Sequence, residues 1–335
     1  MRRHTASFTG LLGFSAAAFL LFAPGMYAQT ELHAEKQILL EARNRTEVIR
    51  RGPDGALYVL HRSVKPPSAI WKSNAARSAM QPVLSADSEP SPFRFPKDFA
   101  VDRAGNVVVV DVGSPEPGSP TIKIFSSDGK LTGSIAVERP ESVGVLSDGR
   151  ILVSGRGERG VPLEHLISVF DRRGKLVGTI GEPAKADEDS KILNLGYIAV
   201  DDQDNIYFAF RYLLTPTVRK YTSDGELVAE WHPQGALMDQ AAARARAIYE
   251  KRDADGRHGW TPVFTAASFD ADGKSLWVAS VRYLFELDGS GSTIQSWELS
   301  GPTGRPVDVH GLVVERDSLY TVGVLSGALE FAKPK

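Results

Sequence analysis

The chain contains no cysteine. Disulfide bonds, thiolate metal sites, cysteine nucleophiles and a lipid-modified N-terminal cysteine are therefore excluded, and a packed core must hold the fold by itself. A large excess of one charge is also lacking, because 39 Lys and Arg residues stand against 41 Asp and Glu residues. Without Arg2 and Arg3 the formal net charge moves from -2 to about -4, which argues against nucleic acid or an anionic membrane as the main partner.

Long apolar runs are lacking except near the N-terminus. There the arginine pair precedes an apolar run from Leu11 to Phe22, and small residues end at Ala28. This order is typical of a secretory signal peptide. A membrane-spanning helix is the alternative, but Pro24 interrupts the run, which is shorter than the roughly 20 residues that a span needs. We expect cleavage after Ala28, a periplasmic or secreted product and no membrane span after signal removal.

One unit recurs through residues 29–335: an apolar stretch, a tight turn, a second apolar stretch, a loop, a third stretch and a second turn. In the clearest copy, Phe99-Ala100-Val101 leads through the turn Asp102 to Asn106 into Val107 to Val110. β-Branched runs favour strands, and Asp, Gly and Asn suit tight turns. The second strand of the unit is expected six times, at Leu57–Leu60, Val107–Val110, Ile151–Ser154, Ile206–Ala209, Leu276–Ser280 and Leu319–Val322.

Six units of four antiparallel strands predict an all-β fold, a six-bladed β-propeller in one domain over residues 29–335. The last unit has only three strands of its own, so Gln37 to Ala42 is expected to supply the fourth and close the ring. The insertion 234–263, between blades four and five, has apolar residues at helical spacing from Ala236 to about Lys251. We predict a helix there, and periodicity leaves open whether it covers the channel as a lid or packs on the rim.

The copies also match a known pattern. The run Phe95 to Asp111, and a second run from Ile198 to Ala209 with Val218 to Leu227, resemble NHL-type repeats. The other four copies keep mainly the turn. The resemblance implies a secreted six-bladed propeller and names no activity, because the motif is structural.

The expected long loops all lie on one face of the propeller, and variable loops on a rigid frame commonly bind ligands. Two sets of polar side chains are predicted to meet there. Residues after the second strands are Arg62, Asp111, Arg156 and Arg211 at equivalent positions, with Arg282 one residue beyond; residues entering the first strands beside the channel are Glu47, Asp98, Glu141, Tyr197 and His310.

Such an arginine arc suits a small anionic ligand, because guanidinium groups bind carboxylates and phosphates in a forked geometry. The alternative is that these charged residues lie at solvent-exposed ends of strands and bind no ligand. The leading hypothesis is an exported binding or scaffold module for a small anionic or protein ligand. Lyase and lactonase families built on propellers provide the rival hypothesis, an enzyme with a metal or acid–base site at the channel mouth. His310 would then be a base or a metal ligand.

The other motifs in the sequence do not support a cofactor or metal site. Gly155 to Gly160 matches the dinucleotide fingerprint, but Leu166 to Phe170 behind it reads as a strand where that fingerprint needs a helix. The Asp-rich turns at 201–204 and 270–273 lack a full set of calcium ligands. The histidines show no metal-type spacing, so we expect no cofactor and no metal site, and the sequence leaves open whether the protein is an enzyme.

Overall fold

The computed structural model describes residues 30–38, 46–62, 68–86, 93–113, 119, 121–159, 161–184, 190–271, 273–324 and 327–334. The expected signal peptide, its cleavage site and residues 39–42 of the expected closing strand lie outside these ranges. Among the described residues, no helix is both long and apolar enough to cross a membrane.

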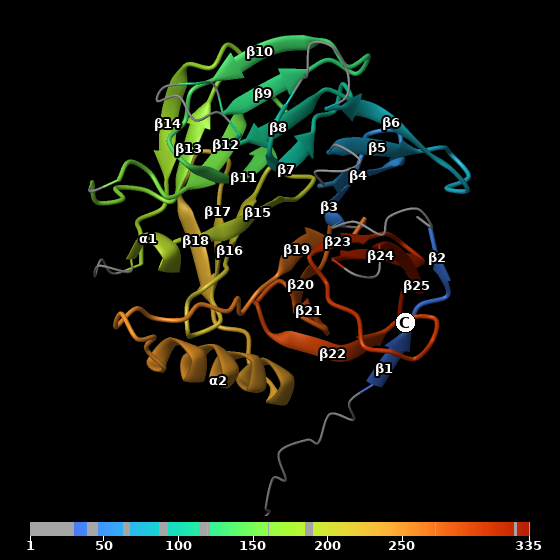
Figure 1. Ribbon diagram of the computed structural model, residues 1–335, viewed down its shortest axis with the longest axis vertical. Helices are drawn as coiled ribbons and strands as arrows, with labels where there is room; N and C mark the ends of the chain where they lie inside the picture. The colour runs from blue at the N-terminus through green and yellow to red at the C-terminus, as the bar shows by residue number, and fades with distance from the viewer. Residues whose placement is uncertain are drawn as a thin grey trace, which may run out of the picture.

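Within these ranges the strands form six sheets, each with four antiparallel blade strands, arranged as blades in a ring (Figure 1). This confirms the predicted six-bladed β-propeller. Blade 1 contains β3 (Thr46–Arg51), β4 (Leu57–His61), β5 (Ala69–Ser73) and β6 (Met80–Ser85); blade 2 contains β7 (Pro96–Val101), β8 (Val107–Asp111), β9 (Ile122–Phe125) and β10 (Leu131–Ile135); blade 3 contains β11 (Pro140–Val145), β12 (Ile151–Gly155), β13 (Ile167–Phe170) and β14 (Leu176–Ile180).

The other three blades complete the ring. Blade 4 contains β15 (Gly196–Val200), β16 (Ile206–Phe210), β17 (Val218–Tyr221) and β18 (Leu227–Trp231); blade 5 contains β19 (Ala266–Phe269), β20 (Leu276–Ser280), β21 (Tyr283–Leu287) and β22 (Thr293–Ser300); blade 6 contains β23 (Gly311–Val314), β24 (Ser318–Gly323), β25 (Gly327–Ala332) and β2 (Lys36–Gln37). Each predicted second strand coincides with β4, β8, β12, β16, β20 or β24.

The second strands are buried because each lies between two neighbouring blades. All five residues of β8 are buried, whereas the outermost strand β10 is mainly exposed. The apolar side chains gather in six clusters, each shared by two adjacent blades. The core is therefore a series of layers between blades, which explains why the second strands read as continuous apolar runs.

The N-terminal segment closes the ring. Lys36 and Gln37 pair antiparallel with Glu330 and Leu329 of β25, so the prediction for the start of the closing strand is confirmed, one residue earlier than expected. An additional strand, β1 (Thr30–His33), pairs in parallel with β22 as a fifth strand of blade 5. Figure 1 shows both N-terminal strands beside the C-terminal blades.

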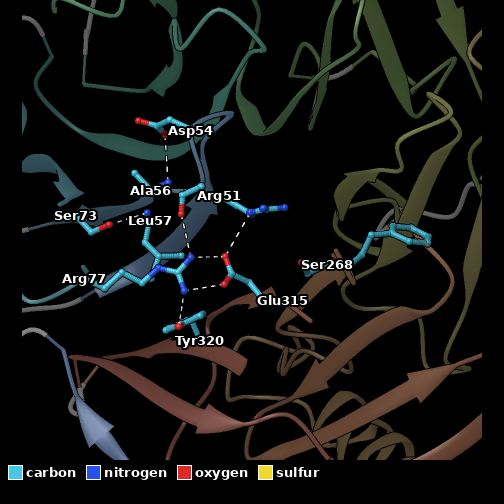
Figure 2. A network of polar contacts seen from close by, with 11 residues as sticks. Arg51, Asp54, Ala56, Leu57, Ser73, Arg77, Ser268, Glu315 and Tyr320 are labelled. Atoms are coloured by element: carbon cyan, nitrogen blue, oxygen red, sulfur yellow. Dashed lines mark hydrogen bonds and ion pairs between the residues drawn. The ribbon is translucent and has the colours of Figure 1, made fainter. Parts of the chain in front are cut away.

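A polar network fastens blade 1 to blade 6 at the opposite face of the ring from the long loops. Arg77, in the β5–β6 turn, contacts both carboxylate oxygens of Glu315 at 2.7 and 2.5 Å. It also donates to the Tyr320 hydroxyl at 2.5 Å and lies over that ring. Arg51 reaches the same carboxylate at 3.3 Å (Figure 2). The ring is thus closed by side chains as well as by strand pairing.

The insertion between blades 4 and 5 contains the predicted helix, α2 (Ala236–Glu250). Its buried residues Met238, Ala242 and Ala245 lie on the predicted apolar side. Met238 and Ala245 join the apolar cluster between blades 4 and 5, and Gln240 accepts a hydrogen bond from Tyr283. Figure 1 places α2 at the outer edge of the ring, so the helix packs on the rim. A single further helical turn, α1 (Ser190–Leu193), precedes blade 4.

Candidate functional site

A cavity of about 280 Å³ opens at the mouth of the channel on the long-loop face. It is bounded by the first residues of the inner strands and by residues that follow the second strands, and none of its lining residues belongs to α2. The structure therefore brings together most of the residues predicted from sequence. Those lining the cavity are Glu47, Arg62, Asp98, Glu141, Arg156, Tyr197, Arg211 and His310.

Two of the arginines are held by carboxylates of their own blade. Arg62 donates to Glu47 at 2.5 Å in blade 1, and Arg156 donates to Glu141 at 2.9 Å in blade 3. Lys97 also contacts Glu141 at 2.7 Å. In each first strand the carboxylate occupies a β-bulge, where the pairing register shifts. A bulge re-aims its extra residue, which here brings the carboxylate to the arginine.

Asp98 is a buried residue of the cavity lining. It accepts hydrogen bonds from Arg50 at 2.7 Å and from the Ser142 hydroxyl at 2.9 Å. The backbone N–H groups of Phe99 and Val143 donate to the same carboxylate. Arg50 also lines the cavity at the opposite end of the channel. Because Asp98 is fully engaged, it positions Arg50 between the two cavities and has little capacity left for a ligand.

Arg211 differs from the other arginines of the cavity. Its guanidinium lies 5.6 Å from the ring centroid of Tyr197 and 5.0 Å from that of Tyr212. Within the described residues, no carboxylate forms an ion pair with Arg211, and its buried Nε has no hydrogen-bond partner. Burial lowers the pKa of Arg211, but Tyr197, Tyr212, Glu141 and Glu47 raise it by more, so the side chain stays charged.

The missing carboxylate has a structural cause. In blade 4 the first strand pairs with β16 without a bulge, so no extra residue is placed opposite Arg211. Tyr197 pairs there with Ala209, as Asp98 pairs with Val110 in blade 2. Blade 4 therefore has no residue at the bulge position that carries the acid in blades 1 and 3.

His310 is a neutral base at the edge of the cavity. The pKa of His310 is lowered from its ordinary value, chiefly by burial and also by the charges of Arg211 and Arg62, against the opposing effect of Glu47 and Asp308. The imidazole is therefore largely uncharged at neutral pH, and its free electron pair is available to accept a proton or a hydrogen bond.

Two residues of the predicted arc lie outside the cavity. Asp111 is the last residue of β8, paired with Pro96, so it aligns with His61 and Gly155 and not with the arginines that follow them. Its buried carboxylate accepts backbone N–H groups of Arg94 and Phe95 and an ion pair from Lys123.

Arg282 is the second residue placed elsewhere. It lies in the tight turn between β20 and β21, where it contacts Glu298 at 3.0 Å and the Tyr283 hydroxyl at 3.0 Å. Its position two residues after β20 directs it toward the outer strand and away from the channel.

Three polar lining residues were missed from sequence: Arg50, Lys97 and Tyr212. Arg50 is not singled out by residue type, because its neighbour Arg51 in β3 is also charged and contacts Glu315 of blade 6. Lys97 and Tyr212 directly neighbour predicted residues, but a bulge and a loop conformation decide where they point.

The cavity is cationic and poorly suited to a metal ion. Arg50, Arg62, Lys97, Arg156 and Arg211 oppose three carboxylates, a surplus of two positive charges. Each carboxylate is already paired with a cation. Among the described residues, no group of three or more His, Asp and Glu side chains could hold a metal. The metal-dependent form of the enzyme hypothesis therefore does not fit these residues.

Comparisons with known proteins support the fold. No protein family matches the chain, and no curated protein sequence matches it. Among solved structures, a streptogramin B lyase is similar with a TM-score of 0.52 and 13% identity, covering 90% of this chain and 87% of the lyase. Virginiamycin B lyase from Staphylococcus aureus has a TM-score of 0.54 and 10% identity, covering 89% and 98%.

A putative gluconolactonase is a third similar structure. Its TM-score is 0.54 at 13% identity, and the match covers 91% of this chain and 96% of that protein. These identities establish a shared propeller fold and no more. The similarity to NHL repeats in particular stays a prediction.

Proposed function

We propose that the cavity at the channel mouth binds a small anionic ligand, with Arg211 as its main charge partner. The observation that carries this proposal is the contrast among the arginines. Arg62 and Arg156 have a carboxylate within hydrogen-bond distance, whereas Arg211 lies between two tyrosine rings with its Nε unsatisfied. A partly buried cation without an ion-pair partner is costly, and an anion bound at the guanidinium offsets that cost.

The surrounding charges favour the same ligand. The positive surplus of the cavity attracts an anion, and each hydrogen bond between an arginine and a carboxylate sheltered from water contributes about 1.5–3 kcal/mol. The volume of about 280 Å³ limits the part held inside the cavity to a small acid. Glu47 and Glu141 hold Arg62 and Arg156 in place, which leaves Arg211 as the group that gains most from the ligand.

The test is a calorimetric and thermal-shift screen of small carboxylates, phosphates and acidic sugars at low salt. We expect Arg211→Ala to weaken binding at least about tenfold, Arg211→Lys to retain part of it, and added salt to weaken it further. Arg282→Ala is the matched control, because Arg282 lies outside the cavity and should leave affinity unchanged. Absence of any anion that binds, or equal binding by Arg211→Ala, would refute the proposal.

A second candidate function is acid–base catalysis on the bound acid. It is favoured by the neutral His310 on the cavity wall, which can take a proton from a substrate whose anionic group is held at Arg211. The similar structures are described as lyases and a putative lactonase, which supports this enzyme reading over a scaffold role. General base catalysis typically contributes about 10²–10⁴-fold.

This candidate is tested by mass spectrometry of ligands incubated with the protein, beginning with the small acids that bind in the screen. His310→Gln should lower turnover by about 100-fold or more while affinity is retained. Unchanged turnover in this variant would remove His310 from the mechanism. Binding without turnover of any ligand would leave a binding module.

Export completes the proposal. Its support is the order of charged, apolar and small residues before Gln29. Cell fractionation and N-terminal sequencing should find a periplasmic or secreted protein that begins after Ala28. A cytoplasmic protein that retains Met1 would contradict it.

A further inference from the structure

A row of aromatic rings leads outward from the cavity. It begins at Tyr212, whose ring centroid lies 6.1 Å from that of Trp260. Trp260 lies 5.2 Å from Tyr249, and Tyr249 stacks on His258 at 3.9 Å. Tyr212 lines the cavity next to Arg211, whereas the other three residues belong to the insertion that contains α2. We call these four residues the aromatic row.

Packing and hydrogen bonds fix the position of the insertion that carries this row. Met238, Ala242 and Ala245 of α2 are buried, and the backbone N–H of Val263 donates to the carbonyl of Arg211 at 2.8 Å. The His258 ring contacts the Tyr249 carbonyl at 2.6 Å. The insertion is therefore tied both to the rim and to the arginine of the candidate site.

The rings of the row remain partly exposed. Tyr212, Tyr249, His258 and Trp260 are all of intermediate exposure. Trp260 is partly exposed and does not belong to the apolar cluster between blades 4 and 5, so packing of that core does not account for it. Tyr212 lines the charged cavity, and the partly exposed rings beyond it can supply the apolar contacts that the charged lining lacks.

We infer that the aromatic row binds the ring of a ring-bearing carboxylic acid whose carboxylate pairs with Arg211. This inference rests on the proposed function and specifies its ligand class. The Arg211 guanidinium lies 5.0 Å from the Tyr212 centroid, so carboxylate and ring need only a few bonds between them.

The arrangement of the two nearest rings fits such a ligand. Tyr212 and Trp260 meet at 77°, which forms a corner and not a flat wall. A ring placed in this corner contacts the face of one side chain and the edge of the other, both favourable geometries. Two kinds of acid share this chemistry: aromatic acids and cyclic sugar acids.

The experiment compares acids of equal charge with and without a ring by isothermal titration calorimetry. Glucuronate is matched with open-chain gluconate, and phenylacetate with hexanoate. We expect the wild type to bind at least one ring acid tenfold or more tightly than its open-chain partner, and the preferred pair identifies the kind of ring. Trp260→Ala, which changes no residue of the cavity lining, should abolish this preference and leave the affinity for the open-chain acid unchanged.

Control variants separate recognition from folding. Trp260→Phe keeps a ring and should keep most of the preference, while Trp71→Phe, at a partly exposed tryptophan of blade 1, should change nothing. Equal affinity for ring and open-chain acids, or a preference that survives Trp260→Ala, overturns the inference while the proposed anion site stands. If neither class of acid binds and Arg211→Ala has no effect, the proposed function fails and the inference fails with it.

Discussion

Arg156 donates from Nε to Glu141 across 2.9 Å, and the partners are 15 residues apart in the chain. Arg62 and Glu47 repeat this contact in blade 1 with the same separation. Both pairs depend on a β-bulge in the inner strand. Blade 4 keeps the arginine but lacks the bulge, so the presence or absence of one inserted residue decides whether an arginine has a built-in counter-ion.

Removing a built-in counter-ion should strengthen anion binding. In Glu141→Gln, Arg156 and Lys97 lose their carboxylate and the positive surplus of the cavity rises. We expect about a two- to fivefold higher affinity for a small acid, the effect of one partly screened charge contact, together with about 1–3 kcal/mol lower stability. Calorimetry and urea unfolding measure the two effects. Weaker anion binding in this variant would show that Glu141 itself takes part in recognition.

Asp111 should matter for stability and not for binding. Asp111→Ala leaves buried backbone N–H groups and Lys123 without their carboxylate, which we expect to cost about 3–5 kcal/mol with anion affinity unchanged. Burial alone would raise the pKa of Asp111, but Lys123 and the N–H groups of Phe95 and Arg94 lower it below its ordinary value.

The sign of the pH effect follows from this direction. Because the folded protein binds the proton of Asp111 less readily than the unfolded chain does, the stabilisation is complete above the ordinary carboxyl pKa and is lost as pH falls through the lowered value. Urea unfolding between pH 7 and pH 3 should show a steeper acid loss for the wild type than for Asp111→Ala. Parallel curves would contradict the assignment.

The network between blades 1 and 6 should contribute to ring closure. Arg77→Ala removes its charged contacts with Glu315 and its bond to Tyr320, and we expect about 1.5–3 kcal/mol lower stability in urea unfolding. Lys130→Ala is the control, because its partner Asp128 lies on the exposed surface and such pairs contribute little. If both variants unfold alike, the network does not stabilise the seam.

The N-terminal strands should stabilise the ring in two separable steps. A chain beginning at Arg43 lacks β1 and β2, and we expect about 2–4 kcal/mol lower stability than for a chain beginning at Gln29, from the lost strand pairing. A chain beginning at Glu35 lacks β1 alone and should fall between them. Thermal melting distinguishes these outcomes, and identical melting of the Arg43 and Gln29 chains would mean that closure by β2 adds nothing.

The architecture was predicted well from the sequence, because the buried strands and tight turns of each blade appear as short apolar runs and turn residues that are close together in the chain. Val107 to Val110 is continuously apolar since neighbouring blades cover both faces, and Gly105 supplies the positive φ of the turn before it. β1 was not predicted, because Thr30 to His33 has a single apolar residue and depends on pairing with Trp297 and its neighbours.

The site was predicted less completely, because its geometry depends on single-residue register. Counting from strand ends placed Asp111 with the arginines, although its pairing with Pro96 makes it part of the strand. Among the residues that the structure describes, Arg156 has an ion-pair partner and Arg211 has none because of a β-bulge, and no pattern in the sequence shows where a bulge lies. The aromatic row is also invisible to periodicity, because Tyr212 and Trp260 are distant in sequence and meet only through the path of the insertion.

The pairing of Gln37 with Leu329 joins segments from opposite ends of the chain. Contacts of such large sequence separation carry a high loop-closure entropy and form late. The last blade therefore remains a three-stranded sheet with an open edge until β2 docks, and the other blades can assemble first from local hairpins. The slowest folding step should be the capture of β2 by β25, and until then the edge of β25 is the place where a second chain can pair and aggregation can begin.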